Sequence, residues 1–247
     1  MPPASAHAPM RTPSAEPRTD TPRSAAPVAL PLALGAIAYS AWLLEIPLDT
    51  GLSPVSSYVS ELAAQDQPYG TLLRTTDLVA GVLILAGAVC ALLRLPRGRL
   101  AVLGWAGLAL FGAATAVDSR LPLSCTPTAD AACAAREGAG LVPWTHAAHV
   151  GSSGVAVAGA LAGMVLLTIA SRRYGIPPSL AGPLGVVLVL LELAATAWTL
   201  AAVAAFDAGR GTWALGLGQR LQVLLIAVWL GLLARAVVRG GRGSGLS

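Results

Sequence analysis

Six apolar runs of about 20 residues constrain this chain more than any other feature of its sequence. Each run is long enough to cross the hydrocarbon core of a bilayer as an α-helix. Charged residues make up only 11% of the chain, whereas a soluble domain carries about 25%. We therefore expect an all-α integral membrane protein, a six-helix bundle whose transmembrane domain covers residues 28–239. The expected spans are Val28–Leu44, Thr75–Leu93, Leu100–Val117, Thr145–Ser171, Ser179–Ala205 and Ala214–Val238.

Polar segments flank this domain at both ends of the chain. Residues 1–27 are rich in Pro, Ala, Ser and Thr and cannot bury a core, so we expect a disordered tail. Residues 240–247 are expected to form a second disordered tail. A cleaved signal peptide is the alternative for the first span, which is short and contains Ala36-Ile37-Ala38. The long leader, and the lack of a strong cleavage site after the apolar run, favour a retained span.

The placement of arginine predicts how the spans are oriented. Eleven arginines lie on one side of the six spans and five on the other, and the chain has no lysine. Because positive charge favours the cytoplasmic side, we expect both termini in the cytoplasm and a plasma-membrane location. The outer loops then cover approximately residues 45–74, 118–144 and 206–213. The net charge of +4 is spread over span ends, which indicates membrane lipids rather than nucleic acid as partners and leaves a protein partner open.

The first outer loop contains the polar sequence SPVSSYVSELAAQDQPYG, which begins at Ser53. Serine followed by proline is typical of a helix start, and apolar residues recur at positions 55, 58, 59 and 62. We therefore expect a short interfacial helix with one apolar side. Three polar residues on its other side either face solvent or point into a pocket between the spans. They are Ser57, Ser60 and Glu61.

The second outer loop contains Cys125 and Cys133. Nearby thiols in an oxidising compartment usually pair, so we expect a disulfide, with metal binding as the alternative. Cys90 lies inside the second span and is expected to be a buried apolar residue.

Two histidines follow this loop in the sequence WTHAAH. His146 and His149 are three residues apart, so both imidazoles point the same way on a helix. They either bind a metal together with Asp118 or Glu61, or hold a general base beside Ser60, or hydrogen-bond to the loop at the headgroup level.

Ionisable residues inside the spans are costly and therefore need partners or a function. Asp77 and Arg220 lie at similar depth, which predicts an ion pair between the second and sixth spans. Glu192 lies near the middle of the fifth span. It is either protonated and hydrogen-bonded to Gln219 or Gln222, or part of a proton relay.

Several of these sequences together are characteristic of a known family. They are SSYVSEL (Ser56–Leu62) with Pro68-Tyr69, the segment Asp77 to Gly81, CTPTADAAC (Cys125–Cys133), WTHAAH (Trp144–His149) and GQRLQVLLIAVWLGLLAR (Gly218–Arg235). Over about Leu30 to Val238, the chain resembles the prokaryotic membrane family called domain of unknown function 998. The resemblance implies a six-helix bundle and brings no established activity. Ser124 departs from the pattern, since an acidic residue is expected there, and this weakens metal models that need that carboxylate.

A looser similarity connects the chain to ceramidase-type membrane hydrolases, which combine a serine, an aspartate and several histidines around zinc. The corresponding residues here would be Ser60, Asp118, His146 and His149. This chain has only two usable histidines, and they have HxxH spacing. The similarity is therefore an analogy.

Three functions remain open from the sequence. The first is a zinc-assisted hydrolase or transferase acting on lipid-linked substrates. Enzymatic activity is thus one hypothesis among the three. In it His146, His149 and Asp118 hold zinc, Glu61 is the base or a fourth ligand, and Ser60 orients the substrate. This hypothesis predicts that the five side chains converge within about 6 Å. The second function is a non-enzymatic lipid-binding or complex-assembly protein, and the third is a small transporter that uses Glu192.

Overall fold

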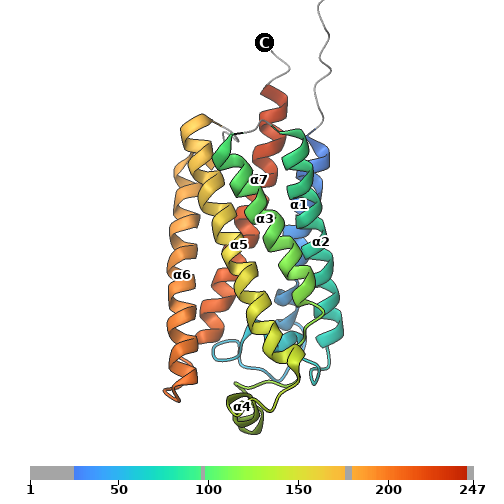
Figure 1. The fold of residues 1–247 in the computed structure, drawn as a ribbon, viewed down its shortest axis with the longest axis vertical. Coiled ribbons are helices and arrows are strands. Elements are labelled where there is room, and N and C mark those ends of the chain that lie inside the picture. The colour runs from blue at the N-terminus through green and yellow to red at the C-terminus, as the bar shows by residue number, and fades with distance from the viewer. Residues whose placement is uncertain (1–24, 96–97, 176–179, 244–247) are drawn as a thin grey trace, which may run out of the picture.

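The computed structural model describes residues 25–95, 98–175 and 180–243, which form a bundle of long helices (Figure 1). Six of the described helical segments are long and apolar enough to cross a membrane, and the described residues contain no β-strand. The predicted all-α membrane fold is therefore confirmed. The elements, with η for a 3-10 helix, are α1 (Ala26–Tyr39), η1 (Ala41–Glu45), η2 (Val59–Ala63), α2 (Gly70–Arg94), α3 (Arg99–Asp118), α4 (Ala131–Gly138), α5 (Trp144–Tyr174), α6 (Pro183–Asp207) and α7 (Leu215–Gly243).

The helix boundaries differ from the predicted spans where polar side chains find backbone partners. The helix α2 begins one turn before the predicted span, and polar residues in this turn are bonded locally. Arg74 Nη2, for example, donates to the Thr71 hydroxyl at 2.9 Å. The first span bends at Ser40, whose hydroxyl donates to the Ala36 carbonyl at 2.9 Å, and η1 follows. The helix α7 continues to Gly243, into the expected C-terminal tail. The expected N-terminal tail lies almost wholly outside the described residues.

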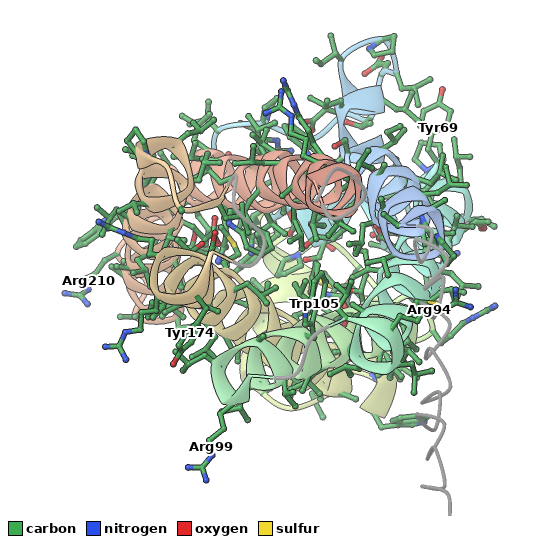
Figure 2. The ribbon with its side chains drawn as sticks, turned by 90° about the horizontal axis from the view of Figure 1, so that it is seen from above. Tyr69, Arg94, Arg99, Trp105, Tyr174 and Arg210 are labelled. Atoms are coloured by element: carbon green, nitrogen blue, oxygen red, sulfur yellow. A yellow bond between two sulfur atoms is a disulfide. The ribbon has the colours of Figure 1, made fainter. Side chains whose placement is uncertain are left out.

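The chain places the start of α1 and the end of α7 at the same end of the bundle (Figure 1). The short helix α4 and the loops around it lie at the opposite end, called here the loop end. Viewed along the bundle, Arg94 and Arg99 point away from the helices, whereas Trp105 points inward (Figure 2). This arrangement agrees with an even number of spans. The cytoplasmic location of the termini and the identity of the membrane stay predictions.

Small residues set the spacing of the central helices. A side chain at Gly159 of α5 would bring its Cβ within 2.7 Å of the Phe111 backbone nitrogen and 2.8 Å of the Gly107 carbonyl oxygen of α3. Lipid tails are as apolar as leucine, so membrane helices associate through close packing rather than through the hydrophobic effect. The approach of α3 and α5 brings Asp118, at the end of α3, beside the first turns of α5. Cys90 is half-buried in α2 against this core.

Candidate functional site

The first outer loop contains a short helix, but it starts later than the sequence suggests. Ser53 forms one isolated turn, in which its carbonyl accepts from the Ser57 N–H at 2.8 Å. The backbone is then extended at Tyr58 before η2 begins at Val59. Ser57 and Glu61 are buried, so the polar side of the predicted helix points into the protein. Ser60 is half-buried and lines a cavity, as described below.

The beginning of α7 holds this loop through a buried ion pair. Arg220 donates from Nε and Nη2 to the two carboxylate oxygens of Glu45, at 2.7 and 2.5 Å. Its Nη1 also donates to the carbonyls of Ser57 at 2.8 Å and Gly216 at 3.1 Å. The predicted pair between Asp77 and Arg220 is therefore wrong. The bend after α1 carries Glu45 over the first turns of α7, and a bidentate carboxylate fits the guanidinium fork.

Close backbone contact completes the attachment of the loop to α7. A Cβ at Gly216 would lie 2.6 Å from the carbonyl oxygens of both Pro54 and Ser57. One turn further on, Gln219 Oε1 accepts from the Val59 N–H at 2.8 Å. These contacts give a physical reason why the serine-glutamate sequence and the GQR sequence occur together in one chain.

Glu61 connects the two outer loops. Its Oε1 accepts from the Thr128 N–H at 2.7 Å, and its Oε2 accepts from the Tyr58 N–H at 3.0 Å and from the Thr128 hydroxyl. Burial raises the pKa of the Glu61 carboxyl, and the hydrogen bonds from Thr128, Tyr58 and Ser57 act in the opposite direction. Thr128 lies between Cys125 and Cys133, which form the predicted disulfide. Glu61 therefore anchors the disulfide loop.

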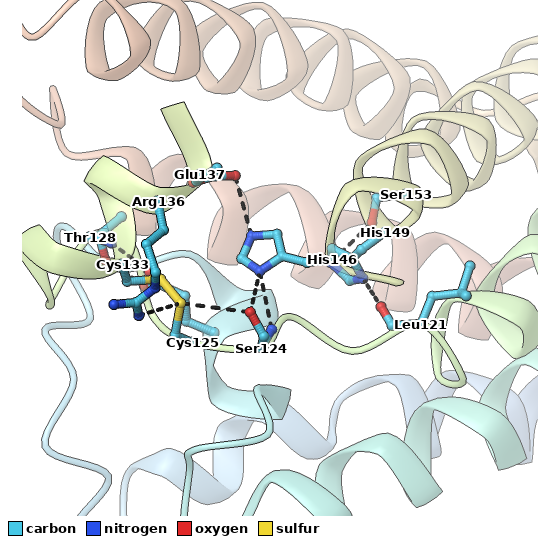
Figure 3. Close-up of polar contacts among 11 residues, drawn as sticks. Leu121, Ser124, Cys125, Thr128, Cys133, Arg136, Glu137, His146, His149 and Ser153 are labelled. Carbon is cyan, nitrogen blue, oxygen red and sulfur yellow. Dashed lines mark hydrogen bonds and ion pairs between the residues drawn. A yellow bond between two sulfur atoms is a disulfide. The ribbon is translucent and has the colours of Figure 1, made fainter. Parts of the chain in front are cut away.

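The two histidines of α5 point to different partners (Figure 3). The Nδ1 atom of His146 accepts from the Ser124 N–H at 3.1 Å and lies 3.0 Å from the Ser124 hydroxyl. Its Nε2 lies 3.4 Å from Glu137 Oε1 of α4. Because a backbone N–H only donates, Nδ1 carries the lone pair and Nε2 carries the proton. His146 is therefore fully engaged with the second outer loop.

His149 belongs to a second group, on the side of α5 that faces a cavity. Its Nδ1 lies 3.0 Å from the Leu121 carbonyl oxygen and 3.1 Å from Asp118 Oδ1. Its Nε2 lies 3.3 Å from the Ser153 hydroxyl, which donates to Asp118 Oδ2 at 3.0 Å. The Ser152 hydroxyl also contacts Asp118 Oδ1. We call Asp118, His149 and Ser153 the serine-histidine-aspartate cluster.

The predicted zinc ligands are divided between these two groups. His146 is bonded to Ser124 and Glu137, whereas His149 lies with Asp118. Across the described ranges, no group of three or more His, Cys, Asp or Glu side chains is arranged to hold a metal ion. The zinc assignment stays a prediction, as do the catalytic roles of Ser60, Glu61 and Asp118.

Ser153 lies between two cavities. The smaller, with a volume of about 160 Å³, is called here the polar chamber. Two carboxylates line it, Asp77 and Asp118, and so does Trp42, whose indole Nε1 has no hydrogen-bond partner among the described residues. Further polar lining comes from Tyr39, Ser60, Thr115, Ser153, Gln219 and Gln222. Asp77, which does not pair with Arg220, is therefore a chamber residue.

The larger cavity, of about 490 Å³, lies between α5 and α6 and is called here the α5–α6 groove. Its rim includes strongly exposed apolar residues of both helices, such as Val150 (64% exposed) and Leu200 (65%). Its polar lining consists of Tyr58, Ser60, Glu137, His149, Ser153, Thr196, Thr199, Asp207, Gln219 and Gln222. The outer loops contribute Leu123 and Pro127, which cover the groove at the loop end. The groove therefore opens sideways, between two spans.

Glu192 lies below the groove on α6. Its Oε1 accepts from the Thr196 hydroxyl at 3.4 Å, and that hydroxyl accepts from Gln222 Nε2 at 2.8 Å. Gln222, one of the two predicted partners, thus interacts with the Glu192 carboxyl and is also linked to it through Thr196. Glu192 Oε2 and Thr199 Oγ1 have no hydrogen-bond partner within the described part of the chain. The proton-relay and transporter readings stay predictions.

Sequence reasoning missed Ser153 and the threonines of α6. A signal for Ser153 was present, because it follows His149 by four residues and the two side chains share one helix face. The sequence GSSG around it interrupts an otherwise apolar span. Thr196 and Thr199 carry no such signal, since single threonines are common in membrane helices and usually bond to their own backbone.

Comparison with known proteins assigns the family. The family described as protein of unknown function (DUF998) matches residues 32–236. The chain belongs to this family. No curated protein and no solved structure matches the chain. This DUF998 protein is thus a multi-pass membrane protein, as its six apolar helices indicate, and its activity has to be inferred from its own geometry.

Proposed function

We propose that this DUF998 protein binds a neutral lipid of the leaflet on the loop side, with an acyl chain in the α5–α6 groove. The observation that carries the proposal is the groove itself, a cavity of about 490 Å³ with an exposed apolar rim and a polar wall. Sites for small ligands usually occupy about 300–1,000 Å³ and combine apolar walls with a few polar groups.

The position of the groove suits entry from the membrane. It extends along α5 from His149 to Leu161, which is about 18 Å at 1.5 Å per residue. A hydrocarbon core is about 30 Å thick, so the groove reaches about as deep as one leaflet. The second outer loop lines it at the loop end, through Leu123 and Pro127. A lipid tail would therefore enter between α5 and α6.

The charges around the groove favour a neutral headgroup. Among the described residues, two carboxylates line it, Glu137 and Asp207, and no arginine does. An anionic phosphate would meet like charge without a guanidinium partner. Hydroxyl and amide groups of Ser60, Ser153 and Gln219 lie at the polar wall and suit the ester and hydroxyl oxygens of an acylglycerol.

Native mass spectrometry of the full chain in detergent tests this proposal, with a monoacylglycerol and an anionic phosphatidylglycerol as probes. We expect one monoacylglycerol to bind and to be favoured over the anionic lipid. Ala158→Trp fills the groove and should abolish binding. Val155→Trp is the matched control, because Val155 is exposed on α5 and lines neither cavity. Equal binding to both tryptophan variants would refute the groove as the lipid site.

The same spectra test the zinc prediction, because a bound zinc ion adds its own mass to the protein. A stoichiometric zinc adduct that disappears in His149→Ala would support the metal-assisted hydrolase. It would also require His146 to leave Ser124 or Glu137, since both of its ring nitrogens are engaged.

A further inference from the structure

We propose that Ser153 is an acyl-accepting nucleophile and His149 its general base, so that the protein cleaves an ester of the lipid in the groove. For its substrate this inference rests on the proposed function. Ser153 lines both the α5–α6 groove and the polar chamber. A serine between a lipid site and a polar cavity can meet an ester from one side and water from the other.

The contacts of His149 determine which nitrogen acts as the base. A carbonyl oxygen only accepts, so Nδ1, at 3.0 Å from the Leu121 carbonyl, carries the proton in the neutral ring. The lone pair is then on Nε2, which lies 3.3 Å from the Ser153 hydroxyl. Nucleophile and base therefore lie close to hydrogen-bond distance, as covalent catalysis by serine requires.

Asp118 is the positioning residue of the cluster. Its Oδ1 lies 3.1 Å from His149 Nδ1, so the carboxylate stabilises the imidazolium that forms when Nε2 takes up a proton. Its Oδ2 accepts from the Ser153 hydroxyl at 3.0 Å. The hydroxyl has a single hydrogen and must rotate from Asp118 to His149 before attack.

Donors for the developing oxyanion line the same two cavities as Ser153. Gln219 is held by its Oε1, which accepts from the Val59 N–H at 2.8 Å, and its amide NH2 group remains as a donor. The Ser60 hydroxyl is a second donor. Gln219 and Ser60 line both cavities together with Ser153. Fixed donors of this kind stabilise a tetrahedral intermediate.

The reaction proceeds in two balanced steps. The Ser153 oxygen attacks the ester carbonyl, its proton passes to His149 Nε2, and the carbon–oxygen bond to the alcohol breaks as His149 returns the proton to the leaving alcohol. The acyl group is then on Ser153. Water attacks this ester, His149 takes one water proton and returns it to the Ser153 oxygen, and the fatty acid is released.

The polar chamber supplies the water for the second step. A cavity of about 160 Å³ that is lined by two carboxylates and an unpaired indole N–H is polar and roomy enough for several waters. Because Asp118 and Ser153 both line the chamber, such water reaches the acyl group without crossing the groove.

Covalent labelling tests this inference on the full chain. The wild type is incubated with a small fluorophosphonate and, separately, with one that carries a long alkyl chain, and the modified peptide is mapped by mass spectrometry. We expect the adduct on Ser153. His149→Gln should slow labelling at least about 100-fold, as expected for loss of a general base. Ser152→Ala removes the neighbouring hydroxyl, which contacts Asp118 but lines neither cavity, and this variant should still be labelled on Ser153.

The two probes separate this inference from the proposed lipid binding. Labelling of Ser153 by the small probe alone supports the nucleophile and counts against an alkyl site in the groove. Lipid binding in the native spectra without any Ser153 adduct from either probe overturns the nucleophile and leaves the lipid site standing. Labelling of Ser152 and Ser153 to the same extent also overturns it, because that outcome indicates an unselective reaction of serine hydroxyls with the probe.

Discussion

His146 and His149 lie one turn apart on α5, yet their imidazole rings contact different parts of the protein. His146 is buried, and both of its ring nitrogens meet residues of the second outer loop, Ser124 and Glu137. His149 is also buried, at 9% exposure, but it lines the α5–α6 groove and lies beside Ser153 and Asp118. The same residue type thus belongs to a closed hydrogen-bond network at one position of α5 and lines a cavity one turn later.

The comparison extends to the regions that surround each histidine. The outer cap, formed by the first two outer loops, also contains Glu61 and the Arg220–Glu45 ion pair, whose polar atoms find protein partners. Around the groove and chamber, Trp42 Nε1 and Thr199 Oγ1 lack a hydrogen-bond partner among the described residues, and in the cap the same is true of Gln67 Oε1. Buried polar groups are usually satisfied by protein or water, so the unsatisfied ones indicate where a ligand or water binds.

The largest expected effect concerns the ion pair of the cap. Arg220→Met leaves the Glu45 carboxylate buried without its partner, which costs about 3–5 kcal/mol of the free energy of unfolding. Thermal unfolding in detergent measures the loss. Arg120→Met, at an exposed residue of the same end, should change stability by less than about 0.5 kcal/mol. Adding Glu45→Met to Arg220→Met should restore part of the lost free energy of unfolding, because it removes the unpaired carboxylate. If it does not, the ion pair does not stabilise the cap.

An intermediate effect compares the two histidines directly. His146→Ala leaves the N–H of the half-buried Ser124 without its acceptor, at a cost of about 1–3 kcal/mol. His149→Ala should cost less, because water from the cavities can replace the ring. Hydrogen exchange of residues 121–143 should therefore accelerate more in His146→Ala. The reverse order would show that His149, rather than His146, holds the cap.

The smallest expected effect is a pH dependence of the cap. Burial raises the pKa of Glu61 above its usual 4.5, so between these two values the folded protein binds more protons than the unfolded one. The contribution of Glu61 to the free energy of unfolding is then fully present below pH 4.5. It is lost as the pH rises through the raised pKa. Hydrogen exchange of the cap across this window should show the trend. In Glu61→Gln, hydrogen exchange of the cap should depend less on pH. An unchanged pH dependence would mean that another group causes it.

Several features of the site could be read from the sequence because they depend on neighbours along the chain. The disulfide follows from two cysteines eight positions apart in one outer loop, and it forms. The helical spacing of the SSYVSEL sequence places Ser57 and Glu61 on one polar side, and both side chains are buried. The choice between solvent and pocket remained open, because helical spacing shows which residues share a side and not what that side faces.

Other features were out of reach because they depend on contacts between distant segments. Arg220 pairs with Glu45 rather than Asp77, since the bend at Ser40 carries Glu45 across the first turns of α7. The i, i+3 spacing of the histidines suggested a shared ligand, and the path of the second outer loop gave each a different partner instead. Loop paths of this kind are not encoded in local periodicity.

The sequence by itself determined the six spans, the all-α fold and the disulfide, because hydropathy and the 1.5 Å rise of a helix act locally and add along the chain. Only the tertiary structure decided that Ser153, His149 and Asp118 meet at the boundary of two cavities. That meeting depends on the relative depth and rotation of α3 and α5, which the contact at Gly159 sets. Close packing fixes these variables, and no single helix contains the information.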